Sequence, residues 1–215
     1  EWHHARRAVG DRGAAGGALR IGLQNDLAAT HIGEWVGEIR SALPGRSFYF
    51  ELDYSNQMCL DLMRGDLDVA VLYTPRAIPD LHLEIVGEVA YRMVSTEAAA
   101  IGEIVPQRYV LAGFSPHFER VHRQRFPDLS AASLSTGQNV AVCGLLGAIG
   151  GTAFVLEESA RAFVETGLYH YVADADPIVQ PVYFGVNTRN RHTHACRRIA
   201  EIVRRRFAAR GDSRQ

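Results

Sequence analysis

The chain is poor in cysteine, carries almost no net charge and lacks any long apolar run. Its three cysteines, Cys59, Cys143 and Cys196, are widely spaced, so no disulfide framework is expected and a reducing cytoplasm is the predicted compartment. The formal net charge of −1 removes the simplest argument for nucleic-acid binding by this chain. No apolar run approaches the roughly 18 residues that a membrane span needs, so no membrane partner is expected.

The N-terminal segment lacks the apolar core of a secretion signal. Either the protein stays in the cytoplasm or the sequence begins after a removed segment. Residues 1–17 are interpreted as the end of a helix followed by a Gly/Ala linker, because glycine and alanine crowd its second half. We therefore expect the chain to be a piece of a longer protein.

The overall composition is that of a soluble globular protein, with 47% hydrophobic and 22% charged residues. The length of 215 residues suffices for one large domain or two small lobes. Charge is unevenly distributed, since seven arginines fall within residues 197–215. Such a run is typical of a solvated face on a C-terminal helix, and contact with an acidic partner or with DNA is the alternative.

Strands and helices alternate through the first part of the chain. Short apolar segments rich in β-branched and aromatic residues predict strands at residues 18–24, 47–54 and 69–73. Residues 25–30 are predicted as a connecting loop, and apolar residues at helical spacing over 32–43 predict a helix. A second helix is predicted over 56–64, with Ser55 as its N-cap and Gly65 as its C-terminal glycine. This order predicts a parallel, doubly wound sheet with right-handed crossovers.

The rest of the chain repeats these types of element in a different order. Residues 83–95 predict one or two strands, and the further strands and helices are expected at 108–114, 116–126, 131–136, 139–151, 152–167, 180–188 and 193–208. The pattern predicts an α/β fold of two lobes, with the second lobe inserted in the first. The predicted boundaries are 1–17 for the linker, 18–95 plus 188–215 for lobe I, and 96–187 for lobe II.

The stretch "LMRGDLDVAVLYTP" separates structural from functional residues around one buried strand. Asp66 and Asp68 precede the strand at the sheet's N-terminal edge, where we expect them to bind turn amides. Ligands of open α/β sheets bind outside the carboxyl ends of the strands. Tyr73 and Thr74, at the other end of this strand, are therefore predicted to face a cleft between the lobes.

Three predicted helix starts are expected to converge on that cleft. Unpaired N–H groups and partial positive charge at a helix N-terminus suit an anion, and the residues concerned are Gln24, Asn25, Asp26, Ser55, Asn56, Thr136, Gly137 and Gln138. Ser55 is the strongest single candidate, with simple capping of its helix as the alternative. Asp26 opposes an anionic ligand, so it is either a plain N-cap or a sign of a ligand with an amine or hydroxyl.

Three further residues are candidates for the ligand site, each with a structural alternative. Ser115 and His117 follow the predicted strand at 108–114 and are expected on the second lobe's side of the cleft. A lone histidine is more often a surface or packed residue than a ligand group. Phe184, in the strand predicted at 180–188, is a candidate for lining the pocket, and core packing is its alternative.

No catalytic, metal or cofactor site is predicted. The segment "HTHAC" at 192–196 contains ligands that zinc favours, but their alternation where a helix begins prevents all three from facing one ion. Neither a G-x-S-x-G nor a G-x-G-x-x-G motif follows a predicted strand. The sequence therefore favours a binding protein over an enzyme.

Several segments together resemble the effector-binding domain of LysR-type transcriptional regulators. The resemblance is carried by residues 17–23, 60–73 and 147–172, and it extends over about 17–208. It implies the type 2 periplasmic-binding-protein fold, with two Rossmann-like lobes and a ligand cleft between them. It also implies that a Ser or Thr at the start of the second helix, here Ser55, contacts the ligand, for which small carboxylates are the common class.

The resemblance further implies partners. Domains of this family form homodimers that build tetramers, and they reach DNA through an N-terminal winged helix-turn-helix domain, so residues 1–17 would be the tail of the linker helix. By this analogy the helix over 30–42 of one protomer would lie near the 117–126 helix of another, with Trp35 expected to be exposed there. A free-standing solute-binding protein of a transport system and an enzyme of the same architecture are the alternative functions.

Overall fold

The computed structural model describes residues 17–212 and divides them into two compact units. Unit 1 runs to Gly87 and resumes at Val182, and unit 2 comprises Glu88–Pro181. Residues 1–16 of the linker predicted over 1–17 lie outside the described residues. None of the described helices has the length and apolarity that crossing a bilayer requires.

Two strands carry the chain from one unit to the other, namely β4 (Leu81–Ser95) and β9 (Ile178–Asn187). Each is continuous across the boundary at which the units divide. The sequence analysis placed the lobe boundaries after residues 95 and 187, which are the last residues of these two strands. Periodicity locates the ends of a strand, whereas the division between units falls in the interior of both strands.

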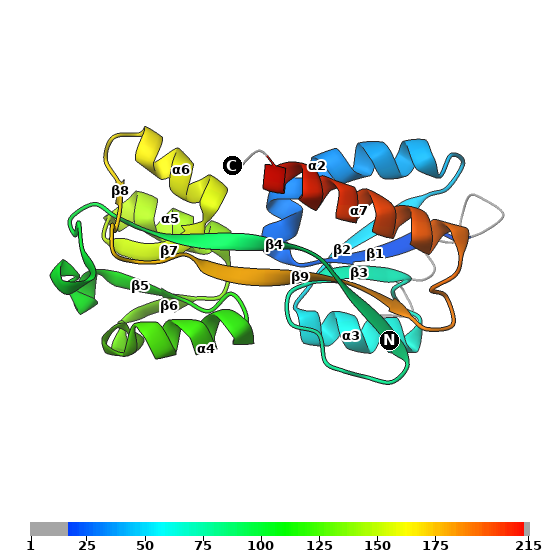
Figure 1. The fold of residues 1–215 in the computed structure, drawn as a ribbon, viewed down its shortest axis with the longest axis horizontal. Helices are drawn as coiled ribbons and strands as arrows, with labels where there is room; N and C mark the ends of the chain where they lie inside the picture. The colour runs from blue at the N-terminus through cyan, green and yellow to red at the C-terminus, as the bar shows by residue number, and fades with distance from the viewer. Residues whose placement is uncertain (1–16, 213–215) are drawn as a thin grey trace. The chain divides into compact units, whose positions relative to one another are not determined.

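Unit 1 contains a sheet in the order β2-β1-β3-β9. Its elements are β1 (Leu19–Leu23), α2 (Asn25–Ala42), β2 (Phe48–Leu52), α3 (Ser55–Arg64), β3 (Val69–Leu72) and α7 (His194–Asp212), together with the adjoining parts of β4 and β9. The predicted parallel pairing is confirmed for β1 with β2 and with β3, and β9 adds an antiparallel strand. Every residue of β3 is buried, as a strand covered on both faces requires. In Figure 1, α2 and α7 lie side by side on one face of this sheet and α3 lies on the other.

Two predicted helix starts differ from the structure. Residues 25–30 form the first turns of α2 rather than a loop. The N–H of Gln24 still binds the Val71 carbonyl of the neighbouring strand (3.0 Å), and the helix begins directly after it. Ser55 is the first residue of α3 rather than its N-cap, which is Tyr54. The predicted closure of α3 by Gly65 is confirmed, with this glycine in the left-handed region at φ 77°.

The two aspartates before β3 bind Arg20 of the neighbouring strand β1. The Asp68 carboxylate accepts a hydrogen bond from the Arg20 N–H (2.7 Å), and the Asp66 carbonyl accepts one from Arg20 Nε (2.6 Å). The sequence predicted that turn N–H groups would bind these aspartates. The observed donors are instead the backbone N–H and the guanidinium of Arg20. These bonds fix β1 against the start of β3.

Trp35 is buried between α2 and α7, so the expectation that it is exposed is wrong. Only 1% of its surface is accessible, its ring stacks on His31 at 5.1 Å, and Phe207 of α7 meets it edge-on at 6.0 Å. Phe207 also covers Gly87, where a Cβ atom would collide with the phenyl ring. Trp35 belongs to the core of unit 1.

The arginines of α7 form ion pairs with acidic residues of unit 1. Arg204 pairs with Glu84 (2.7 Å), and both Arg205 and Arg206 pair with Glu38 of α2. Exposed pairs of this kind each contribute at most about 1 kcal/mol. The pairing favours a structural interpretation of this arginine-rich run over a nucleic-acid contact.

Unit 2 contains strands in the order β4-β7-β5-β6, and β8 also pairs with β4. Its elements are η1 (Ile101–Glu103), η2 (Pro106–Arg108), β5 (Tyr109–Ala112), α4 (Pro116–Arg125), η3 (Pro127–Ala131), β6 (Leu134–Thr136), α5 (Asn139–Ile149), β7 (Thr152–Leu156), α6 (Glu157–Glu165) and β8 (His170–Tyr171). Figure 1 shows α5 and α6 on one face of these strands and α4 on the other. The segment predicted as one or two strands at 83–95 is the single strand β4.

Aromatic rings fill the core of unit 2 beneath α4. Phe114 stacks on Tyr91 with 4.3 Å between ring centroids, and Phe118 meets both rings edge-on. Phe154 of β7 packs against Phe118 at 5.7 Å. Together these rings fix α4 on the sheet and hold the polar surface of this helix in place.

We predict opposite effects for two glycine-to-alanine substitutions in unit 1. Gly87→Ala forces a Cβ into Phe207 and is expected to lower the free energy of unfolding by about 1–3 kcal/mol. Gly33→Ala, at an exposed position of α2 with no neighbour near its added Cβ, is the matched control and is expected to raise it by about 0.5–1 kcal/mol. Urea denaturation measures both, and equal effects would contradict the packing of Phe207 on Gly87.

Candidate functional site

The hydroxyl of Ser55 joins three segments of unit 1. It accepts hydrogen bonds from the backbone N–H groups of Tyr73 (3.1 Å) and Thr74 (3.2 Å), and it donates one to Gln24 Oε1 (3.2 Å). Four predicted site residues are thereby brought together at the carboxyl ends of β1 and β3 and at the start of α3. A hydroxyl has one proton and two lone pairs, so these three bonds use its full capacity.

Polar groups beside this cluster have no such bonds. The Thr74 hydroxyl is buried and has no hydrogen-bond partner among the described residues. Neither α2 nor α3 receives a side-chain cap at its first turn, so the N–H groups at the predicted residues Asn25 and Asn56 are available to a ligand. The carboxyl end of β3 therefore combines an unsatisfied hydroxyl with two helix N-termini.

Asp26 changes the electrostatics at the start of α2. It is buried in the first turn, where the positive end of the helix dipole favours a carboxylate. Its negative charge opposes an anion at that helix start. The start of α3 has no acidic residue in its first turn and suits an anion better.

The predicted residues Ser115 and His117 lie at the start of α4 in unit 2, beside β9. Ser115 is the N-cap of α4, accepting from the Phe118 N–H (3.0 Å), and its hydroxyl donates to the buried amide oxygen of Gln180. His117 donates from Nε2 to the Val179 carbonyl (3.0 Å). Both side chains tie α4 to the first residues of β9.

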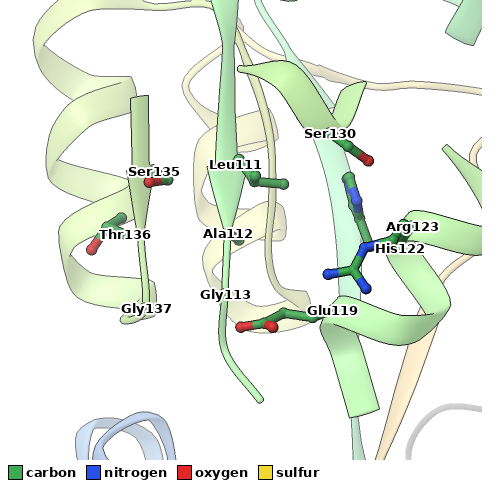
Figure 2. Close-up of a pocket in the computed structure, with 10 residues that line it drawn as sticks. All are labelled: Leu111, Ala112, Gly113, Glu119, His122, Arg123, Ser130, Ser135, Thr136 and Gly137. Atoms are coloured by element: carbon green, nitrogen blue, oxygen red, sulfur yellow. The ribbon is translucent and has the colours of Figure 1, made fainter. Parts of the chain in front are cut away.

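A cavity of about 510 Å³ lies within unit 2 between α4 and the strands β5 and β6. The predicted residues Thr136 and Gly137 line it, and the other lining residues are Leu111, Ala112, Gly113, Glu119, His122, Arg123, Ser130 and Ser135. Figure 2 shows the side chains of Glu119 and Arg123 extending from α4 towards β5. The cavity is therefore polar at its helical wall and apolar where Leu111 points into it.

His122 forms the buried part of the helical wall. Its Nε2 shares a hydrogen bond with the Tyr109 hydroxyl (2.7 Å) in the aromatic core. Burial lowers the pKa of His122 to about 4, and the positive charge of Arg123 adds to the shift. The imidazole is therefore neutral at physiological pH and contributes no charge to the cavity.

One predicted residue, Phe184, lies in the core, and three residues near the candidate sites were not predicted. Phe184 is buried in β9 opposite Val71 within unit 1. Sequence reasoning missed Gln180, Glu119 and Arg123. The spacing of Glu119 and Arg123 on a predicted helix is that of an ordinary surface pair. Nothing local marks Gln180 as the partner of a serine 65 positions away.

The buried cysteines Cys59 and Cys196 and the histidines near α7 are by residue type candidates for reactive or metal-binding groups. Burial raises the pKa of the Cys59 and Cys196 thiols, which disfavours the reactive thiolate. Within residues 17–212, no three His, Cys, Asp or Glu side chains are grouped so that they could hold a metal ion. His192 instead accepts a hydrogen bond from its neighbour Arg191 (2.7 Å).

Comparison with protein families matches residues 12–208 to the family described as LysR substrate binding domain. The chain belongs to this family. The match covers most of the 215 residues and confirms the resemblance seen in the sequence. Among curated proteins, no match was found.

Solved structures with the same fold include two regulatory domains and one full-length LysR-type regulator. The reduced regulatory domain of OxyR2 from Vibrio vulnificus is 15% identical, with a TM-score of 0.69 over 91% of this chain and 98% of that one. The regulatory domain of MexT from Pseudomonas aeruginosa is 15% identical, with a TM-score of 0.69 over 88% and 99%. Full-length LysG from Corynebacterium glutamicum with bound effector Arg is 16% identical, with a TM-score of 0.67 over 87% and 67%. The predicted fold class, α/β with two Rossmann-like units of the type 2 periplasmic-binding-protein kind, is confirmed.

We predict that the LysR-type domain loses stability in acid partly through His122. Its pKa in the folded state lies below the ordinary 6.5, so the unfolded chain binds the proton more readily. The stabilising contribution is complete above about pH 6.5 and is lost as the pH falls towards 4, by up to about 3 kcal/mol. Urea denaturation at pH 7, 5.5 and 4 measures the loss.

His122→Gln is the control, because glutamine does not titrate and its amide is also able to bond to a hydroxyl. The variant should lose less stability than the wild-type protein between pH 7 and 4, since only the wild-type side chain gains a proton. Identical pH dependence of the two proteins would contradict a buried neutral His122.

Proposed function

We propose that this chain senses a small-molecule effector for a LysR-type transcriptional regulator and does not catalyse a reaction. The family match over residues 12–208 is the observation that carries the proposal. Regulation follows if the effector binds one conformation of the regulator more tightly than another, since only differential affinity shifts a population. The three free cysteines are consistent with a cytoplasmic location.

The effector contacts proposed in unit 1 are the Thr74 hydroxyl and the first N–H groups of α3. A buried hydroxyl without a partner costs about 1–3 kcal/mol, and a ligand that bonds to it recovers that free energy. Ser55 holds these groups in position, because its hydroxyl accepts hydrogen bonds from the backbone N–H groups of both Tyr73 and Thr74. Further contacts in unit 2 are proposed at Ser115 and His117, whereas Thr136 and Gly137 line a separate cavity of that unit.

We propose a small organic anion as the effector class. The N-terminus of α3 lacks both a side-chain cap and an acidic residue in its first turn, and the preceding Asp53 binds the N–H of the N-cap residue Tyr54 (2.7 Å) rather than the first turn. Asp26 makes the start of α2 less suitable, and an effector carrying a hydroxyl or amine beside its carboxylate fits both helix starts.

Thr74→Val is the sharpest test of the proposed contacts. The substitution removes a hydroxyl that has no protein partner, so stability should change by less than about 1 kcal/mol while effector affinity falls about tenfold. The measurement is a thermal-shift screen against carboxylic acids, amines and sugars, followed by calorimetric titration of each hit. A ligand at 100 times its dissociation constant adds about 2.7 kcal/mol of stability.

Ser55→Ala provides the second arm. It leaves two backbone N–H groups without their acceptor and is expected to cost about 1–3 kcal/mol of stability in addition to weakening the effector. Ser41→Ala is the matched control, because the Ser41 hydroxyl binds only the Gly37 carbonyl of its own helix. A screen without hits, or a hit indifferent to both Thr74→Val and Ser55→Ala, would contradict the proposed site.

We also propose that the domain self-associates and that the regulator reaches DNA through a helix-turn-helix domain outside this chain. Because Trp35 is buried, Trp35→Glu would unfold unit 1 rather than test an interface. Sedimentation velocity of the isolated domain is the direct measurement. A dimer or tetramer is expected at micromolar concentration, and a monomer throughout would contradict self-association.

A further inference from the structure

The cavity of unit 2 carries two opposite charges that do not neutralise each other. Glu119 and Arg123 are both exposed and lie four residues apart on α4, with the glutamate first. This is the order in which such residues ordinarily pair along a helix. Within residues 17–209, however, neither charged group forms an ion pair or a side-chain hydrogen bond.

Gly113 explains where the carboxylate lies. A Cβ at this position would be 3.0 Å from Glu119 Oε1, so the absence of a side chain leaves room for the carboxylate at the end of β5. Figure 2 shows Glu119 beside Gly113 and the Arg123 guanidinium on the same side of α4. The glutamate thus contacts the end of the strand rather than the arginine one turn further along.

The rest of the lining selects for a ligand of matching charge. His122 is neutral and bonded to Tyr109, so the cavity presents one carboxylate, one guanidinium, the hydroxyls of Ser130 and Ser135, and an apolar surface at Leu111. A dianion would be repelled by Glu119 and a dication by Arg123. A ligand with one ammonium and one carboxylate group satisfies both. The volume of about 510 Å³ lies within the usual range of small-molecule sites.

We propose that this cavity is a second small-molecule site, which binds a zwitterion of the free amino-acid class with its ammonium at Glu119 and its carboxylate at Arg123. The site is formed entirely by residues of unit 2. It is therefore distinct from the groups around Ser55 and Thr74 in unit 1, and it goes beyond the function proposed above.

The test is calorimetric titration of the full chain with each of the twenty proteinogenic L-amino acids. Glu119→Gln and Arg123→Gln should each weaken the best-binding amino acid about tenfold or more, because each removes one charge-assisted contact. Both residues are exposed, so the variants should keep the wild-type melting temperature. Glu165→Gln and Arg161→Gln, at exposed positions on α6, are the matched controls and should keep wild-type affinity.

Derivatives of the ligand assign each charge to its partner. The N-acetyl derivative lacks the ammonium, so its weaker binding should be insensitive to Glu119→Gln and sensitive to Arg123→Gln. The methyl ester lacks the carboxylate and should show the reverse. This crossed pattern supports two separate charge contacts, whereas a general effect of net charge would weaken both derivatives alike.

Three outcomes would overturn the proposal. The first is that no amino acid binds, including the case in which Glu119→Gln or Arg123→Gln instead dissociates a dimer because a second copy covers the cavity. The second is binding that neither variant weakens. The third is binding abolished by Thr74→Val with both cavity variants unaffected, which places the ligand in unit 1 and supports only the effector site proposed there.

Discussion

The hydroxyl of Ser55 is the contact on which the polar region of unit 1 depends. Its three hydrogen bonds join the first residue of α3 to Gln24, which follows β1, and to the peptide that follows β3. Each segment is also held by packing, since β3 is wholly buried and Met58, Cys59 and Leu62 of α3 pack in the same core as Ala70 and Leu72. The packing places the elements, and the hydroxyl then fixes the orientation of the backbone groups at their ends.

Unit 2 reaches a similar result by other means. Its aromatic core fixes α4 through Phe118 and His122, and the neutral imidazole is held by Tyr109 inside that core. The adjacent side of the same helix presents Glu119 and Arg123 to the cavity that His122 also lines. A rigid interior thus holds the helix that carries these two charged groups, and neither group forms an ion pair or a side-chain hydrogen bond with residues 17–209.

Local patterns predicted the elements well and long-range contacts poorly. The strands around residues 19–23, 48–52 and 69–72 and the end of α3 at Gly65 follow from periodicity and from glycine's backbone freedom. The burial of Trp35 depends on Phe207, which lies far along the chain, and no local signal announces it.

The candidate site was predicted to a similar extent. Composition at the strand ends identified Ser55, Tyr73 and Thr74, and the structure brings them together with Gln24. The sequence did not reveal that all hydrogen-bonding capacity of the Ser55 hydroxyl is taken by the protein, because that depends on three partners up to 31 positions away. The cavity of unit 2 was missed for a related reason, since a Glu and an Arg four residues apart normally indicate a simple surface pair.

Saturation of the Ser55 hydroxyl changes how an effector in unit 1 is expected to bind. A ligand that takes a hydrogen bond from Ser55 must first displace Gln24, so it exchanges one bond for another and gains little. A ligand that bonds to Thr74 satisfies a buried hydroxyl that otherwise has no partner among the described residues. The net gain is therefore larger at Thr74, and Ser55 acts on the ligand by holding the Thr74 backbone in place. For this reason Ser55→Ala alone cannot distinguish a direct contact with the ligand from positioning of the Thr74 backbone. Removing the Thr74 hydroxyl breaks no hydrogen bond to the described residues, so Thr74→Val tests the direct contact.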